Sequence, residues 1–177
     1  MKIWKDLKRI EGEKANILTL IDNMLFNTGF QAVLLYRISN WAYNLKIPIL
    51  PRAINWYSRF LTSSDISYAA HIEEGLLIIH GMGVVIGANV KMGKNVKLLN
   101  DCTLGNRLGD NENRNDGQPE VGSNVVIGVG SRLLGPIKIG DNAKIGANSV
   151  VLVDVPSGCT AVGSPARIIN KNKLDNN

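Results

Sequence analysis

His80 is the side chain in this sequence that most plainly invites a chemical explanation. It interrupts the apolar stretch LLIIHGMGVVIG, which otherwise reads as part of a buried element. An imidazole with an ordinary pKa of about 6.5 can take a proton from a hydroxyl group near neutral pH, and it can also bind a metal. His80 therefore has three interpretations: a buried core residue, a metal ligand or a proton-transfer catalyst.

Metal chemistry of the three-histidine type is excluded because the chain has only two histidines, His71 and His80. We predict no metal site, and we expect His71 to lie on the exterior. The two cysteines, Cys102 and Cys159, are far apart in a cysteine-poor chain, so we expect reduced thiols and neither a disulfide nor a nucleophile.

The elements that must position His80 are short and repeated. From residue 121 an aliphatic residue recurs every six positions, in VGSNVV, IGVGSR, LLGPIK, IGDNAK, IGANSV and VLVDVP. A less regular version begins at Ile66. A period of six, with glycine and asparagine next to the aliphatic residue, is typical of a β-helix solenoid whose aliphatic side chains stack inside. We therefore predict a mainly β protein.

Two breaks interrupt the period. The step from Ile78 to Ile86 is eight residues and contains His80, and the step from Leu104 to Val121 is seventeen. The extra residues must leave the solenoid, so we expect an extended loop at about 105–120, and long excursions from a regular scaffold are commonly functional. We also expect Gly81 and Gly83 to leave room for a substrate beside His80.

The first 64 residues differ from the rest. Apolar residues at helical spacing in 16–26, 30–45 and 51–65, with Gly29 and Pro48 between them, predict a short α-helical N-terminal region over 1–64. The solenoid is expected over 65–170, and a polar tail over 171–177.

Charge is also unevenly distributed. The net charge of +5 lies entirely in residues 1–64, together with most of the aromatic side chains. A solvated helical face explains this, and so does a surface for peripheral membrane contact. No motif indicates nucleic-acid binding. The chain has neither an apolar run of transmembrane length nor a secretory leader, so we expect a cytoplasmic protein, with the inner face of the membrane as an alternative place.

The hexads, the loop and the closing VPSGCTAVGSPARII together resemble the hexapeptide-repeat acyltransferases, which have a left-handed parallel β-helix. Within them, SDIS, IIHGMGVVIG and GANSVVLVDV are most similar to the serine acetyltransferase branch, especially its shorter relatives that acetylate sugars in surface-polysaccharide biosynthesis. The resemblance implies a left-handed solenoid, a homotrimer with active sites at subunit boundaries, and acetyl-CoA as acyl donor.

The resemblance also implies roles for individual residues. His80 matches the family's general base, and Asp65 matches the aspartate that orients this base and stabilises its imidazolium form. Five residues match positions near the acetyl-CoA: Val129, Gly135, Lys144, Ala147 and Arg167.

The sequence departs from the serine-specific pattern at its acceptor positions. Serine acetyltransferases carry an aspartate before the catalytic histidine and an arginine-histidine pair before the proline of the loop; here these positions are Ile79, Gly117 and Gln118. The ammonium and carboxylate groups of an amino acid would therefore have no charged partners at these positions. We therefore expect acetylation of a sugar hydroxyl, bound beside Ile79 by Asn100, Asn106 and Gln118. The alternatives are serine O-acetylation, amino-sugar N-acetylation and a non-catalytic scaffold.

Overall fold

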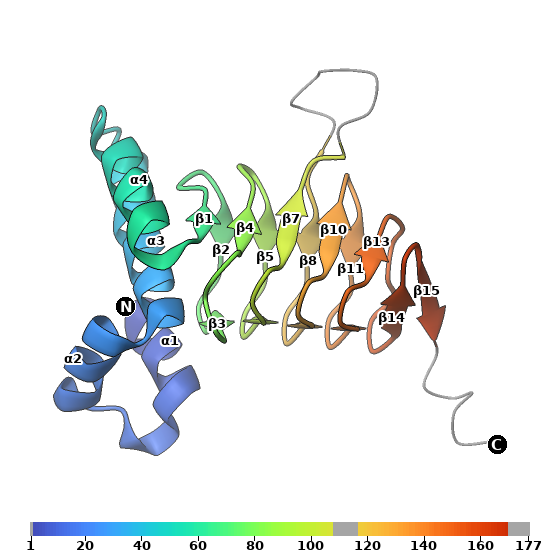
Figure 1. Cartoon of the computed structure of the whole chain (residues 1–177), viewed down its shortest axis with the longest axis horizontal. Coiled ribbons are helices and arrows are strands. Elements are labelled where there is room, and N and C mark those ends of the chain that lie inside the picture. Colours follow the sequence, from blue (N-terminus) through green and yellow to red (C-terminus); the bar gives the residue numbers. More distant parts are fainter. Residues whose placement is uncertain (1, 108–116, 170–177) are drawn as a thin grey trace.

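The computed structural model describes residues 2–107 and 117–169 of the chain. Helices form the first part and short strands the second (Figure 1). The helices are α1 (Lys2–Glu11), the 3-10 helix η1 (Gly12–Lys14), α2 (Ile17–Phe26), α3 (Thr28–Asn44) and α4 (Leu50–Thr62). The strands are β1 (Asp65–Ile66), β2 (His71–Ile72), β3 (Leu77–Ile78), β4 (Val85–Ile86), β5 (Lys91–Met92), β6 (Lys97–Leu98), β7 (Thr103–Gly105), β8 (Glu120–Val121), β9 (Val126–Ile127), β10 (Arg132–Leu134), β11 (Lys138–Ile139), β12 (Lys144–Ile145), β13 (Val150–Val151), β14 (Thr160–Gly163) and β15 (Ala166–Ile169).

Local signals explain where the helices begin. Asn16 caps α2 through a capping box with Thr19, and the Asn27 side chain accepts a hydrogen bond from the Phe30 N–H at the start of α3. A proline in the first turn starts α4, and Ser63, in the left-handed region, ends it. These three helices match the three predicted ones, whereas α1 is an element that the sequence analysis does not assign.

The strands form three sheets that wrap into a solenoid, and their pairs are parallel except for β14 with β15. Sheet A has the order β1-β4-β7-β10-β13, sheet B has β11-β8-β5-β2, and sheet C has β15-β14-β12-β9-β6-β3. The register places the aliphatic residue of each strand directly on that of the next coil; in sheet A these are Ile66, Ile86, Leu104, Leu133 and Val151. All five are buried, so the aliphatic ladder predicted from the hexads is the core.

Three corners join the sheets. The C–A corner, where the chain passes from sheet C to sheet A, consists of residues 79–84, 99–102, 128–131 and 146–149. Its turns stack through backbone hydrogen bonds, such as Gly130 N–H to Asn100 O (3.1 Å) and Asn148 N–H to Val129 O (2.7 Å). Positive φ angles at Asp101, Gly130 and Asn148 allow this tight bend, which suits glycine and asparagine.

The predicted eight-residue step is a lengthened turn at this corner. Residues 79–84 connect β3 to β4, whereas the next turns of the corner have only four residues each. His80 lies in the insertion with a φ of 54°, a conformation that is uncommon for a residue other than glycine, asparagine or aspartate. The extra residues thus lift His80 out of the regular solenoid path.

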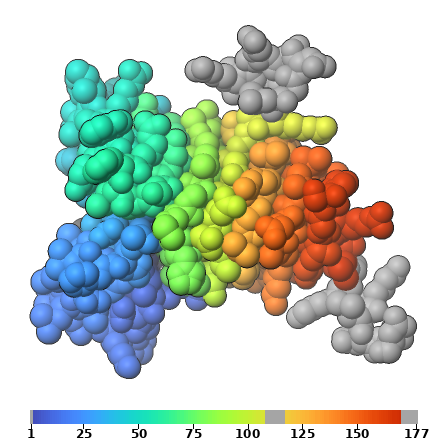
Figure 2. Space-filling model, in the orientation of Figure 1, coloured from blue at the N-terminus to red at the C-terminus, as the bar shows by residue number. Residues whose placement is uncertain are grey.

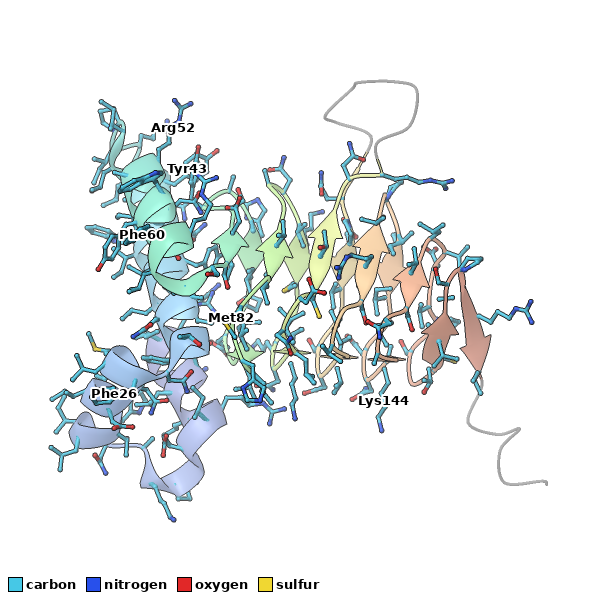
Figure 3. The ribbon with its side chains drawn as sticks, viewed as in Figure 1. Phe26, Tyr43, Arg52, Phe60, Met82 and Lys144 are labelled. Carbon is cyan, nitrogen blue, oxygen red and sulfur yellow. The ribbon has the colours of Figure 1, made fainter. Side chains whose placement is uncertain are left out.

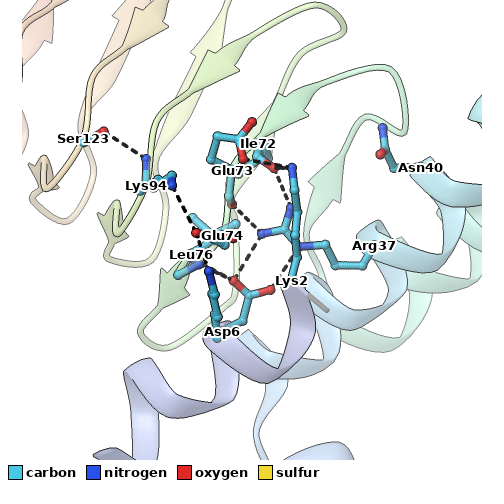
Figure 4. A network of polar contacts seen from close by, with 12 residues as sticks. Lys2, Asp6, Arg37, Asn40, Ile72, Glu73, Glu74, Leu76, Lys94 and Ser123 are labelled. Atoms are coloured by element: carbon cyan, nitrogen blue, oxygen red, sulfur yellow. Dashed lines mark hydrogen bonds and ion pairs between the residues drawn. The ribbon is translucent and has the colours of Figure 1, made fainter.

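The N-terminal helices are attached to the first coil by a buried polar network (Figure 4). Asp6 of α1 is fully buried, and its Oδ1 accepts hydrogen bonds from the N–H groups of Gly75 (2.7 Å) and Leu76 (2.9 Å). Arg37 of α3 pairs with the other carboxylate oxygen and donates to the carbonyl oxygen of Ile72 at 2.6 Å. Because both charges are paired and hydrogen-bonded, the network can exist in the interior.

The far end of the described chain closes differently. β15 pairs with β14 in the antiparallel direction, which ends the parallel coils. Part of the predicted loop, residues 108–116, and the predicted tail, 171–177, lie outside the described residues. No single helix in the described ranges has the length and hydropathy to cross a membrane; α2 and α3 reach both only as a pair bent by 99°.

Candidate active site

The turn that carries His80 is held by backbone hydrogen bonds to both neighbouring coils. Ile79 N–H donates to Leu98 O (2.9 Å), and Gly83 N–H donates to Ser63 O (2.9 Å). The Ser64 hydroxyl, just before β1, also donates to Gly81 O. The His80 side chain itself is exposed and makes no hydrogen bond to any residue in the described ranges, so a fixed backbone presents a free imidazole.

His80 borders a hollow of about 480 Å³ between the solenoid and the N-terminal helices. Leu77, Ile78 and Ile79 line the solenoid side. Residues of three helical segments complete it: Arg9, Ile10, Phe26, Asn27 and Thr28. None of these lining residues is a carboxylate. The sequence analysis missed the helical wall because no local pattern places α1 and α2 beside β3.

Gly81 does not provide the expected room for a substrate. It is buried, and an added Cβ would lie 2.8 Å from the Cα of Gly29, at the start of α3. A Cβ on Gly29 would in turn lie 2.1 Å from the carbonyl oxygen of Ile78. The two glycines therefore allow α3 to pack directly against the turn that carries His80.

Asp65 begins β1 at the same corner, one coil before Val85, with which it pairs. Its carboxylate lies near the Arg59 guanidinium (3.5 Å) and the Asn55 amide (3.4 Å), both on α4. Among the residues that the structure describes, no hydrogen bond joins Asp65 to His80. The predicted pair thus lies at the same corner, but in the single chain the Asp65 carboxylate contacts Arg59 and Asn55 of α4.

Four of the predicted acetyl-CoA residues lie at or beside the C–A corner. Val129 and Ala147 lie in successive turns above Asn100, and their N–H groups donate no backbone hydrogen bond within residues 2–107 and 117–169. Lys144 (Figure 3) and Arg167 lie on sheet C, next to this corner, and their exposed side chains form no ion pair with described residues. Free amide donors along an edge and two nearby cations fit a chain of amides that ends in phosphates.

Three other predicted residues lie at the A–B corner, where the loop leaves sheet A. Asn106 and Gln118 flank the loop, and each has a buried side-chain oxygen without a hydrogen-bond partner among the described residues. Gly135 has a φ of 90°, and a Cβ added there would lie 3.3 Å from the Cβ of Arg107. Gln118 lines a second hollow, of about 330 Å³. Because a buried acceptor without a donor is costly, these oxygens are suited to bind a hydroxyl or an N–H group.

The predicted site is therefore divided between two corners. His80, Asp65, Ile79, Asn100, Val129 and Ala147 gather at or beside the C–A corner, whereas Asn106, Gln118 and Gly135 lie on the other side of sheet A. A single chain does not bring the two groups together.

The remaining candidates for chemistry are explained by their surroundings. Cys102 is buried, its Sγ donates to Gly128 O (3.1 Å), and burial raises the pKa of the thiol, so the reactive thiolate is disfavoured. His71 points outward from sheet B, as predicted, and is exposed. His80 is thus the better-placed of the two histidines for proton transfer.

Comparison with known proteins agrees with this geometry. Residues 119–152 match the family model "Bacterial transferase hexapeptide (six repeats)". The chain is 41% identical to the serine acetyltransferase of Synechococcus elongatus over 149 residues, which are 84% of this chain and 60% of that protein. It is also 41% identical to the serine acetyltransferase of Helicobacter pylori over 150 residues, 85% of this chain and 86% of the relative.

Solved structures show the same fold. The serine acetyltransferase of soybean, solved in complex with serine, superposes with a TM-score of 0.85 at 35% identity, over 95% of this chain and 68% of that one. The enzyme of Neisseria gonorrhoeae superposes with a TM-score of 0.84 at 33% identity, over 99% of this chain and 70% of its own. The predicted left-handed parallel β-helix with a helical N-terminal region is confirmed.

Proposed function

Since the chain belongs to the serine acetyltransferase branch of the hexapeptide-repeat transferases, we propose that it transfers an acetyl group from acetyl-CoA to a hydroxyl group, with His80 as general base. The observation that carries this proposal is the lengthened turn, which presents a free, exposed imidazole at the edge of a hollow. General-base assistance of this kind contributes about 10² to 10⁴ to a rate.

In the proposed reaction, the free imidazole nitrogen of His80 takes the proton of the acceptor hydroxyl as its oxygen attacks the thioester carbonyl. A carbon–oxygen bond forms and the carbon–sulfur bond breaks. The imidazolium returns its proton to the leaving sulfur, which yields free CoA and the acetyl ester. Asp65 would stabilise the imidazolium if its carboxylate turned from Arg59, since their ion pair is half-exposed and weak.

The donor would lie along the C–A corner. Val129 and Ala147 have free N–H groups for its amides, and Lys144 and Arg167 offer cations for its phosphates. Acetyl-CoA supplies the activated acetyl group; the chain supplies position, the base and the donors that stabilise charge developing on the carbonyl oxygen.

A homotrimer would reunite the divided site. If the C–A corner of one chain faces the A–B corner of a second, Asn106, Gln118 and Gly135 of the neighbour come near His80. Exposed Met82 and Val85, beside His80 on the surface that such a neighbour would cover, support this arrangement because apolar side chains are suited to an interface.

The relatives favour L-serine as the acceptor, which the sequence analysis ranks as an alternative. All the relatives named above are serine acetyltransferases, and none of them supports the expected sugar acceptor of polysaccharide biosynthesis. The chain spans 60% of the length of the Synechococcus relative, so the acceptor remains part of the proposal.

A neutral hydroxyl acceptor is the second candidate, and a specific observation favours it. The described lining of the His80 hollow has no carboxylate for the ammonium group of serine, and Ile79 is apolar. An ammonium desolvated without a counter-charge is strongly disfavoured. A sugar hydroxyl needs only hydrogen bonds, which the Asn106 and Gln118 oxygens could accept.

An acceptor screen tests the proposal. The full chain is incubated with acetyl-CoA and either L-serine, neutral sugars, nucleotide sugars or amino sugars, and release of free CoA is measured. Turnover that depends on L-serine would establish the first candidate, and turnover with a neutral sugar the second. Acetylation of an amino sugar on nitrogen, or no CoA release with any acceptor, would contradict the proposed O-acetyl transfer.

A further inference from the structure

The helices form the end of the molecule opposite the C-terminal coils (Figure 2), and many of their apolar side chains are exposed. On α4, Trp56 is 63% and Phe60 80% exposed, and their rings stack with centroids 6.4 Å apart. On α2, Phe26 is 78% exposed. The end face, as we name this surface, comprises the exposed apolar residues Ile17, Leu18, Ile21, Met24, Leu25 and Phe26 of α2 with Ile49, Leu50, Trp56, Tyr57, Phe60 and Leu61 at α4.

The two faces of α4 have opposite roles. Its buried residues, Pro51, Ser58 and Thr62, face the rest of the protein. Trp56 and Phe60 are four residues apart and exposed. Phe60 points away from the solenoid, and α4 lies across the solenoid axis (Figures 1 and 3). An apolar stripe on the outside of such a helix can lie flat against a planar surface.

The charge around this stripe has one sign. Residues 23–64 contain no aspartate or glutamate, but they contain Arg37, Lys46, Arg52 and Arg59. Arg37 pairs with Asp6 and Arg59 with Asp65, whereas Lys46 and Arg52 are exposed and form no ion pair within the described ranges. Around α4 the end face is therefore apolar and aromatic with unpaired cations at its border, whereas α2 adds one exposed carboxylate, Asp22.

We propose that the end face binds the surface of a membrane that contains anionic lipids. Tryptophan and tyrosine favour the head-group region, aliphatic side chains insert below it, and cations at the border attract anionic head groups. A second copy fits less well, because residues 1–64 carry a net charge of +5 and a symmetric contact through this face would bring two regions of like charge together.

Docking in this way would bring the catalytic hollow close to the lipid. Phe26 belongs both to the end face and to the lining of the His80 hollow. An acceptor hydroxyl carried on a membrane-bound molecule would then reach His80 without leaving the surface. The binding itself does not depend on the proposed reaction.

Vesicle co-sedimentation tests the proposal on the full chain. We expect sedimentation with vesicles of phosphatidylcholine and phosphatidylglycerol, much weaker sedimentation with pure phosphatidylcholine, and loss of binding at high salt. Trp56→Ser/Phe60→Ser should weaken binding by about tenfold or more, because both side chains are largely exposed in the folded protein and insert only on docking. Lys46→Gln/Arg52→Gln should also weaken it by about tenfold or more.

Matched controls come from the remainder of the chain. Val153→Ser/Ile168→Ser removes two exposed apolar side chains distant in sequence from the helices, and Lys97→Gln/Lys138→Gln removes two cations of the solenoid; neither pair should change binding. Absence of sedimentation, or binding that the end-face variants do not weaken, would overturn the proposal. Lipid-free association that Trp56→Ser/Phe60→Ser abolishes would assign the face to a protein partner and overturn it as well.

Discussion

At the scale of single residues, the surroundings of the His80 imidazole decide which chemistry it can perform. His80 interrupts an apolar run in the sequence, which marks it as a candidate for chemistry, and in the structure it is exposed in a lengthened turn. The sequence also indicated that His71 points outward, since it occupies an exterior hexad position. It could not indicate that Arg9 and Phe26 line the same hollow, because contacts between a helix and a distant strand leave no local pattern.

Ile79 should control the choice of acceptor. In Ile79→Asp, the new carboxylate next to His80 should pair with the ammonium group of L-serine. Because a charge-assisted hydrogen bond strengthens binding, we expect the KM for serine to fall by about tenfold or more. The measurement is CoA release at varied serine, with Ile79→Asn as the uncharged control of nearly equal size. If Ile79→Asp leaves the KM for serine unchanged, Ile79 does not determine the acceptor.

At the scale of elements, the hexad period predicted both the solenoid and its register, because every sixth aliphatic residue must enter one narrow interior. The eight-residue step likewise predicted the lengthened turn. The sequence does not predict how α1 and α3 attach to the first coil of the solenoid. The Asp6–Arg37 network joins residues 31 positions apart and then contacts Gly75, 69 positions from Asp6, so neither helix pattern reveals it.

The packing of α3 on the turn that carries His80 should couple stability to activity. A Cβ in Gly29→Ala would meet the carbonyl oxygen of Ile78 at 2.1 Å, so the helix or the turn must shift. We expect a loss of about 1–3 kcal/mol in the free energy of unfolding, measured in urea, and a lower rate of CoA release.

Gly105→Ala is the matched control, because an added Cβ there meets nothing within 4 Å. It should change the free energy of unfolding far less. A Gly29→Ala variant as stable and as active as the original protein would show that the turn does not depend on this close approach.

At the scale of the whole molecule, the predicted site residues lie at two corners of the solenoid, and we expect a second copy to bring them together. His80 and Gln118 lie on opposite sides of sheet A, so two variants, each defective at one corner, should complement each other in mixed trimers. We expect co-expressed His80→Ala and Gln118→Ala chains to show more CoA release than either variant alone, because some sites combine two intact corners.

The same preparation should have the mass of three chains of 19.3 kDa, measured by light scattering. A monomer with full activity would refute the shared site. Activity in the mixture no greater than the mean of the two variants alone would refute it as well.

The central claim is that His80 is the general base. The most direct test measures the rate of CoA release in the His80→Ala variant and compares it with the rate in a His71→Ala control. Both histidines are exposed, so neither substitution should unfold the protein, and circular dichroism with a urea midpoint checks this. We predict that His80→Ala lowers the rate by about 10² to 10⁴ and that His71→Ala leaves it unchanged. A folded His80→Ala variant that keeps the full rate would contradict the account.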